Sequence, residues 1–449
     1  MKRSIILLCA ALLRLGTAAA QEPGTPWTLD DCIRYAQEQN IAVQKQALQV
    51  EQSRVRLNTA QLSRLPDLGA SLNGQMAFGR SKSSQDTYID ANTLTGSAGI
   101  SASLPVFQGL RIKRQIAGGK FDLRAAVADF ERAREDVAVN VMSLYLQVLF
   151  NKELVAVAES QLALSSQQVE RSRALVANGK NPESALYESI ALRSKDELTL
   201  TQARGDLSLA LLDLSQALNR PSAEGFDIVD PDLDSTAVDA LSHLRSPAEI
   251  TAYALDNRPH IRAEQLRLAS SSEAIRLARA DRWPQITLTG GYGTNAYKYY
   301  KGPSNWTTES FWSQIRNNSS EYIGLSVNIP IFNRMATRNS IRTADIGYRN
   351  QQLTLTEAEQ ALSKEIEQAF YTARAAWDKY RSARNALESA RIAFAYEEQK
   401  AAAGRSTVFD YNDAKTRMEK AASELVQAKY EFILRTKILD FYGGAPLSL

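Results

Sequence analysis

The chain has 449 residues, with 53 lysines and arginines against 50 aspartates and glutamates. Three of the basic residues, Lys2, Arg3 and Arg14, lie in the first 20 residues, so the rest of the chain carries 50 charges of each sign. A net charge near zero gives no support for a nucleic-acid partner.

The first 20 residues have the pattern of a secretory signal peptide. Lys2 and Arg3 form the positive start, residues 5–13 form a short apolar core, and residues 18–20 form a small-residue cleavage site before Gln21. We therefore leave residues 1–20 out of the fold and expect an exported mature chain.

Cysteine content and hydropathy limit which bonds and which membrane-spanning elements the chain can form. Cys32 is the one cysteine outside the leader, which excludes an internal disulfide or a cysteine metal site. We expect it to be a small buried helix residue. No later segment has about 18 consecutive apolar residues, so the sequence predicts no membrane-spanning helix, and a membrane protein without one needs a closed β-barrel.

An internal repeat organises the chain. Residues 104–107 (LPVF) recur at 329–332 (IPIF), Gly179 recurs as Gly404, and Pro221 recurs as Pro446, each at an offset of 225. A constant offset indicates duplication. We predict a first structural repeat over 21–221, a linker over 222–246 and a second repeat over 247–449. Each repeat is predicted to contain a helix, two strands and a long helical hairpin.

The helices are predicted from the placement of proline and from apolar spacing. No proline lies between Pro105 and Pro182 or between Pro330 and Pro446, and a proline inside a helix costs about 3 kcal/mol. Apolar side chains three, four or seven residues apart indicate coiled-coil seams. One seam comprises Ile366, Phe370, Ala373, Trp377, Tyr380, Leu387 and Phe394. We predict helices at about 28–64, 109–177, 182–219, 247–282, 334–402 and 406–441.

Four candidate strands lie between the helices, at about 67–79, 96–106, 285–299 and 321–332, roughly the length of a tilted membrane strand. In the last one, apolar and polar or small side chains alternate, as in a wall between lipid and water. Aromatic residues near the second strand pair suit an interfacial girdle: Tyr292, Tyr297, Tyr299, Tyr300, Trp306 and Trp312. A soluble sheet with apolar loops is the alternative.

Four strands cannot close a barrel, and the bilayer does not tolerate the two unpaired edges of an open sheet. Several chains must therefore share one barrel, and three chains would supply twelve strands. A helix of about 69 residues is on the order of 100 Å long, comparable with a bacterial periplasm. Such a shape predicts passive conduction.

Turn residues predict two hairpin tips, at 174–187 and 399–414. Gly179 and Gly404 suit the left-handed position that ends a helix. In the first tip we expect Asn181 to cap the next helix and Pro182 to be its first residue.

Several motifs, taken in order, resemble the TolC family of outer-membrane efflux proteins. They are residues 27–33 (WTLDDCI), the two strand-to-helix segments 104–107 and 329–332, and residues 404–414 (GRSTVFDYNDA) at the second tip. The resemblance implies a mostly α-helical chain with membrane β-strands, forming a trimeric twelve-stranded β-barrel continued by a periplasmic α-helical barrel. It also implies an exit duct in the outer membrane for an efflux or type I secretion system.

The implied partners are two further copies of the chain, a periplasmic adaptor, an inner-membrane pump and outer-membrane lipid. Because the tips are the parts furthest from the membrane in such an arrangement, we expect them to dock the adaptor. The residues concerned are Gly179, Lys180, Gly404 and Arg405.

Asp410 and Asp413 are the candidate pore residues. They lie three residues apart at a predicted helix start, hence on one face. The resemblance places them at the periplasmic entrance, where six carboxylates from three chains would attract cations and exclude anions. The alternatives are that Asp410 caps its helix together with Thr407, and that Asp413 is a solvated carboxylate.

The tip departs from the best-known family pattern. Ala185 stands at the first-half position equivalent to Asp410, and Ala401 and Ser406 stand where some members carry a tyrosine and an arginine that latch the closed tip. A latch of that kind is not expected here. Lys180 and Arg405 are the nearby cations that could pair with the carboxylates instead.

The sequence gives little sign of catalysis. His243 and His260 are the two histidines, and no phosphate-binding loop, zinc-protease motif or dinucleotide fingerprint is present. We expect no enzyme activity, no cofactor and no metal site. The competing class of protein is a periplasmic coiled-coil adaptor or scaffold that does not enter the membrane, which membrane fractionation would distinguish.

Overall fold

The structure is a computed structural model that describes residues 26–82, 88–90, 92–231, 245–301 and 309–449. The predicted signal peptide, His243 and Trp306 lie outside these residues. The chain divides into two compact units. Unit 1 consists of Met1–Ala47, Phe130–Arg258 and Glu359–Leu449, and unit 2 consists of Leu48–Asp129 and Pro259–Ala358. Each unit therefore takes segments from both halves of the sequence.

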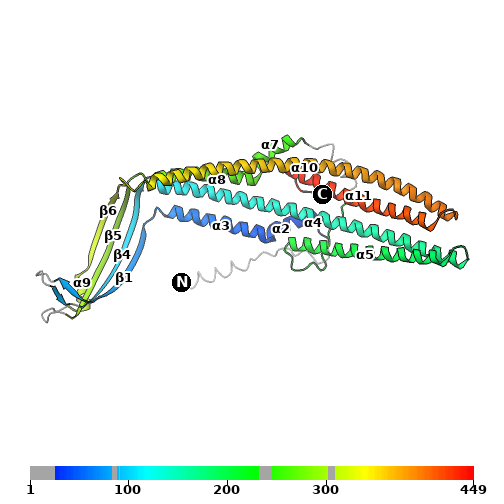
Figure 1. Cartoon of the computed structure of the whole chain (residues 1–449). Helices are drawn as coiled ribbons and strands as arrows, with labels where there is room; N and C mark the ends of the chain where they lie inside the picture. The colour runs from blue at the N-terminus through cyan, green and yellow to red at the C-terminus, as the bar shows by residue number, and fades with distance from the viewer. Residues whose placement is uncertain (1–25, 83–87, 91, 232–244, 302–308) are drawn as a thin grey trace, which may run out of the picture. The chain divides into compact units, whose positions relative to one another are not determined.

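Unit 2 contains a four-stranded antiparallel sheet in the order β1-β4-β5-β6 (Figure 1). The strands are β1 (Asp67–Ala77), β4 (Asn92–Gln108), β5 (Gln285–Lys301) and β6 (Ser320–Asn328). The outer edges of β1 and β6 pair with no other strand in the described part of the chain. The four predicted strands are confirmed, although β4 and β5 are longer than predicted and β6 ends four residues earlier.

Three short elements were not predicted. Strands β2 (Arg80–Lys82) and β3 (Tyr88–Asp90) form a two-stranded ribbon, and helix α9 (Phe311–Asn317) precedes β6. Elements of three and seven residues are too short to leave a periodic pattern in a sequence. A capping residue does mark α9, because the Ser310 hydroxyl accepts a hydrogen bond from the Ser313 backbone N–H.

Each of the helices predicted over 28–64 and 247–282 is in fact two helices, separated by one residue with extended backbone. Asn40 and Arg258 adopt extended backbone, with ψ of 132° and 131°. Arg258 precedes Pro259, whose ring disfavours helical backbone at the preceding residue. The Asn40 side chain accepts a hydrogen bond from the Ala42 N–H and so caps the following helix. The resulting helices are α2 (Leu29–Gln39), α3 (Ile41–Leu62), α7 (Pro247–Asn257) and α8 (Pro259–Ala280).

The two long hairpins follow the prediction closely. They consist of α4 (Arg111–Ala177) with α5 (Glu183–Ala217), and of α10 (Ala336–Ala402) with α11 (Val408–Tyr442) (Figure 1). In the second hairpin the Trp377 and Phe432 rings lie 5.1 Å apart. Five members of the predicted seam on α10 are buried, which confirms its coiled-coil role: Ile366, Ala373, Tyr380, Leu387 and Phe394.

The core of unit 1 is built around the middle of α4, where Met142, Tyr145 and Leu149 are almost fully buried. Helix α4 also contains a stretch long and apolar enough to cross a membrane by composition, where the sequence analysis expected no such helix, and 44% of that stretch is buried. Cys32 packs into the same core with no exposed surface, as predicted. Burial raises the pKa of its thiol to about 12, so the thiol is unreactive at neutral pH.

Candidate functional site

The strand register gives the sheet one apolar face and one polar face. Directly paired residues of neighbouring strands point to the same side of a sheet. The apolar face carries Leu68, Leu72, Met76, Leu94, Ile100, Leu104, Ile286, Leu288, Tyr292, Ile323, Leu325 and Val327. The other face carries Ser71, Asn73, Gln75, Thr95, Ser97, Ser101, Thr287, Thr289, Asn295, Ser326 and Asn328. The alternation predicted for the last strand therefore extends to all four strands, with exceptions on both faces. Lys298 and Glu321 lie on the apolar face, and Tyr297, Tyr299 and Tyr322 lie on the polar face.

The apolar face is open to solvent in the single chain. Leu72 and Ile323, on the two edge strands, are 85% and 87% exposed. A soluble monomer seldom leaves a continuous apolar surface of this kind uncovered. Together with the two unpaired edges, the exposed face argues against the alternative of a soluble sheet.

The polar face has a packing constraint that the sequence analysis missed. A Cβ atom built at Gly291 would lie 2.7 Å from the Tyr322 ring and 2.9 Å from the Ile100 carbonyl oxygen. A glycine is therefore required at residue 291, because any side chain there would clash with the Tyr322 ring and with the backbone of β4.

Helix α9 covers the part of the β5 edge that β6 does not reach. The Tyr297 N–H donates to Gln314 Oε1, and Gln314 Nε2 donates back to the Tyr297 carbonyl. One glutamine side chain thus replaces a strand partner. On the same helix Phe311 and Trp312 are 58% and 76% exposed, at the end of the strands where the aromatic cluster was predicted.

The first tip ends α4 with a Schellman turn. Gly179 has φ of +67°, its N–H bonds to the Val176 carbonyl, and the Lys180 N–H bonds to the Leu175 carbonyl. The predicted cap of the next helix is wrong by one residue. Pro182, and not Asn181, is the N-cap of α5, and it makes no side-chain capping bond.

The second tip repeats the same turn. Gly404 has φ of +70°, its N–H bonds to the Ala401 carbonyl, and the Arg405 N–H bonds to the Lys400 carbonyl. Ser406, at a position of the family latch, donates a hydrogen bond to Glu397 of the same tip. The hydrogen bonds from Ser406 and then Lys400 lower the pKa of the Glu397 carboxyl.

Both candidate pore carboxylates have partners within their own helix. The Thr407 hydroxyl accepts from the Asp410 N–H and donates to Asp410 Oδ2 at 2.6 Å, which confirms the predicted capping role of Thr407. Asp413 lies 2.7 Å from Arg417 Nη2, and its side chain is 43% exposed. Pairing of these carboxylates with Lys180 or Arg405 is not found among the described residues, so that alternative fails within a single chain.

The tips also expose aromatic side chains that the sequence analysis did not single out. Phe409, between Thr407 and Asp410, is 77% exposed, and Tyr187 near the start of α5 is 66% exposed. By contrast Ala185, the first-half equivalent of Asp410, is buried.

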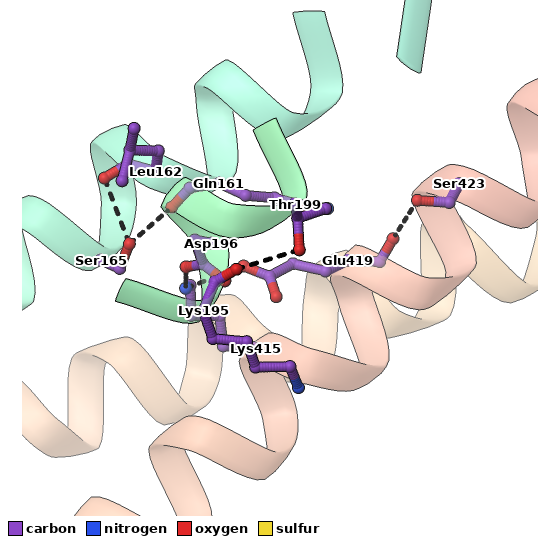
Figure 2. A network of polar contacts seen from close by, with 9 residues as sticks. All are labelled: Gln161, Leu162, Ser165, Lys195, Asp196, Thr199, Lys415, Glu419 and Ser423. Carbon is purple, nitrogen blue, oxygen red and sulfur yellow. Dashed lines mark hydrogen bonds and ion pairs between the residues drawn. The ribbon is translucent and has the colours of Figure 1, made fainter. Parts of the chain in front are cut away.

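A buried charge network joins the two hairpins, and the sequence analysis missed it. Lys415 on α11 has no exposed surface, and its Nζ lies 2.7 Å from Asp196 Oδ2 on α5 and 2.9 Å from Glu419 Oε1 on α11. Figure 2 shows these side chains converging, with Ser165 of α4 nearby. Burial raises the pKa of the Glu419 carboxyl, an effect that Lys415 opposes. The network therefore fixes the contact between α5 and α11.

A signal for this network was present in the sequence. Tyr411, Lys415 and Met418 have the four-then-three spacing of a seam, so a lysine in the middle is predicted to be buried. A buried lysine requires a carboxylate partner, although the sequence does not identify which one. Asp196, four residues before the buried Leu200 on α5, supplies it.

Comparison with known proteins gives the family. A sequence model of the outer membrane efflux protein family matches residues 32–220 and 252–439. The outer membrane efflux protein BepC of Brucella suis is 21% identical over 436 residues, which cover 96% of this chain and 89% of BepC.

Solved structures share the fold. The structure of CusC matches with a TM-score of 0.78 at 18% identity, covering 93% of this chain and 92% of CusC. The outer membrane protein VceC from Vibrio cholerae matches with a TM-score of 0.75 at 16% identity, covering 93% of this chain and 96% of VceC. The resemblance and the outer-membrane location predicted from the sequence are confirmed, and the adaptor alternative is not supported. The chain belongs to the outer membrane efflux protein family and acts in the outer membrane as an exit duct.

Proposed function

We propose that three copies of this chain close one twelve-stranded β-barrel, and that their helices continue it as an α-helical barrel in the periplasm. The observation that carries the proposal is the four-stranded sheet with an exposed apolar face, a polar face and two edges that pair with no other strand among the described residues. In a closed ring the apolar face meets lipid, the polar face lines the channel, and β1 of one copy pairs with β6 of the next. The predicted repeats over 21–221 and 247–449 then alternate around the ring.

The duct is passive in this proposal, and an inner-membrane pump supplies the energy through a periplasmic adaptor. The docking surface is the pair of tips carrying Gly179, Lys180, Gly404 and Arg405. Two features support this assignment: the tips contain turns with the same hydrogen bonds, and each exposes an aromatic side chain of the kind that anchors protein interfaces, Tyr187 and Phe409.

Asp410 and Asp413 are the proposed selectivity residues at the periplasmic mouth. Asp410 is exposed and its partner Thr407 is neutral, so its charge stays at the mouth, whereas Arg417 offsets part of the charge of Asp413 in a surface pair. Three copies would present six carboxylates. We expect the double variant Asp410→Ala, Asp413→Ala to lower the cation-to-anion permeability ratio and to weaken block by multivalent cations.

The test uses purified protein in planar lipid bilayers. Wild-type protein should give single-channel conductance steps with a preference for cations. The double variant should still give conductance steps, but its preference for cations should be lost. The matched control is Glu424→Ala, an exposed carboxylate elsewhere on α11. If the wild-type trimer gave no conductance steps, the proposal that the protein is a duct would be refuted. If an assembled double variant kept the selectivity of the wild type, only the role of Asp410 and Asp413 as selectivity residues would be refuted.

A further inference from the structure

A groove of about 510 Å³ lies at one end of the sheet, between the strands and helix α9. Its sheet residues include Leu94, Ala296 and Lys298, which belong to the apolar face, and α9 contributes Phe311 and Gln314. All of them lie in unit 2. The volume and the mostly apolar lining fall in the range of small-molecule sites, and the conduction proposed for the chain makes no use of this groove.

Helix α9 covers the end of the apolar face. Thr294 Oγ1, on that face, donates to the Ile315 carbonyl of α9 at 2.7 Å. Ala296, the next residue on the same face, is 4% exposed although most of the face is open. Asn318, which ends the helix, reaches the polar-face residue Asn295 around the edge of β5. The groove under the helix is therefore on the side of the sheet that meets lipid in the proposed barrel.

The groove is hollow because the side chains beneath α9 are small. Gly74, Gly96 and Ala296 are directly paired across β1, β4 and β5. In the next row towards the strand ends, Leu94 pairs with Lys298, and both side chains are long. The floor of the groove is therefore apolar backbone and methyl surface, with an aliphatic side chain and a cation at its border.

The position along the strand places the groove near the surface of the membrane. Ala296 lies ten residues after Ile286 on β5, which is roughly 34 Å along a strand. At a strand tilt of about 40° this becomes about 26 Å along the membrane normal, against about 25 Å for the apolar band of a membrane barrel. The groove thus lies where acyl chains meet headgroups, and Lys298 lies at the level of the headgroups.

Two cations at this end of the sheet are available to an anionic group. Lys298 is exposed, its Nζ lies 5.3 Å from the centroid of the Tyr300 ring, and it forms no ion pair with a described residue. Arg316 is exposed on α9, one turn after the exposed Trp312, and it also has no carboxylate partner in the part of the chain that the structure describes. Aromatic and basic side chains together are typical of contact with lipid headgroups.

The acidic residue at the groove is engaged within its own helix region. Glu309 Oε2 accepts hydrogen bonds from Ser313 Oγ at 2.7 Å and from Asn317 Nδ2 at 3.1 Å. These bonds turn the carboxylate towards α9, so it does not neutralise Lys298 or Arg316. The groove therefore combines an apolar trough with unpaired positive charge.

We propose that the groove binds a phosphorylated lipid of the outer leaflet, with part of an acyl chain between α9 and the strands and the phosphate on Lys298 and Arg316. The proposal rests on the proposed barrel, because the apolar face meets lipid there. It adds a specific lipid site to that barrel. Cargo inside the channel is not the occupant, because the groove lies on the opposite side of the sheet from the polar lining.

The test is native mass spectrometry of the purified full-length protein in detergent. The probe is lipid A with two phosphate groups, titrated against lipid A from which both phosphates have been removed. Wild-type protein should retain one phosphorylated lipid per chain and bind the dephosphorylated lipid at least fivefold more weakly. Excess inorganic phosphate should not displace the lipid, because phosphate alone does not fill the apolar groove.

Two variants address the two parts of the site. Gly74→Leu fills the groove and has room for its Cβ atom, so it should assemble normally and bind lipid at least tenfold more weakly. Its control is Ala70→Leu, on the same face of the same strand but outside the groove. Lys298→Gln should weaken binding of the phosphorylated lipid at least fivefold and leave binding of the dephosphorylated lipid unchanged. Its control is Lys120→Gln, at an exposed lysine on α4.

The outcomes separate this site from the barrel. Lipid binding by Gly74→Leu or Lys298→Gln equal to that of wild type would overturn the site, and displacement of the lipid by phosphate would overturn it in favour of a simple anion site. Because lipid is counted per chain, a trimer that retains no lipid would overturn the site and leave the barrel standing. A monomer that retains one lipid would support the site and overturn the barrel.

Discussion

Replacement of Lys415 by methionine tests the buried network between the hairpins. Methionine keeps most of the aliphatic stem and removes the ammonium group, so the change isolates the charge. Lys415 has no exposed side-chain surface, and the Asp196 side chain is 6% exposed. Removing one partner of a buried ion pair leaves an uncompensated charge, which costs about 3–5 kcal/mol. We therefore expect Lys415→Met to destabilise the helical hairpins by that amount.

A compensating variant separates charge burial from packing. Lys415→Met with Asp196→Leu removes the Lys415–Asp196 pair, and replacing a buried pair by apolar side chains is often neutral or stabilising. The Glu419 carboxyl remains, and because burial raises its pKa it can take up a proton once Lys415 is gone. We expect this double variant to recover at least about 2 kcal/mol of the loss. The matched control is Lys420→Met on the same helix, because that side chain is 76% exposed and a surface pair contributes about 0–1 kcal/mol.

The assay is loss of the helical circular-dichroism signal on heating the detergent-solubilised protein. Lys415→Met should unfold at a clearly lower temperature than both wild type and Lys420→Met. A single variant indistinguishable from the Lys420→Met control, or a double variant less stable than the single one, would refute the reasoning that the charge is buried and paired.

Three further changes test the tips, the sheet faces and the pH response. Gly179→Val and Gly404→Val have room for the new side chain but must hold a left-handed backbone, so each should cost about 1–2 kcal/mol and reduce adaptor binding in pull-down assays. An equal loss of trimer would show that the turns serve folding only. Leu72→Arg, on the apolar face, should cost about 2–4 kcal/mol and lower the fraction of trimer in detergent extracts. Ser71→Arg, on the polar face, should still form trimers but lower the channel conductance. The reverse order would contradict the assignment of the faces. Burial raises the pKa of Glu419 above its ordinary 4.5, so the fold holds that proton more tightly than the unfolded chain and stability should fall as pH rises between the two values. Glu419→Gln should flatten that slope in thermal melts, and a slope equal to that of wild type would exclude Glu419 as its source.

The sequence was sufficient to predict the elements that depend on local chemistry. Stretches without proline predicted the long helices α4 and α10. The glycines at the two tips adopt the left-handed backbone that was predicted for them. The helix break at Arg258 could also have been predicted from the sequence, because Pro259 follows it. Asn40 gave a weaker signal, because an asparagine is compatible with a helix interior as well as with a cap.

Features that depend on distant partners were harder to predict. The burial of Lys415 follows from its seam spacing, but its pairing with Asp196 joins residues 219 positions apart. The two-faced sheet required the register of β1 against β4 and of β4 against β5, which alternation in a single strand does not fix. For Asp410 and Asp413 the structure adds the local partners Thr407 and Arg417, while their role at the mouth stays a prediction.

The proposal that several chains share one barrel predicts the mass of the assembled particle. Native mass spectrometry of the protein extracted from outer membranes in mild detergent should give three times the mass of the mature chain. A monodisperse monomer that retains its β-sheet signal would contradict the account, because the unpaired edges of β1 and β6 would then have no partner.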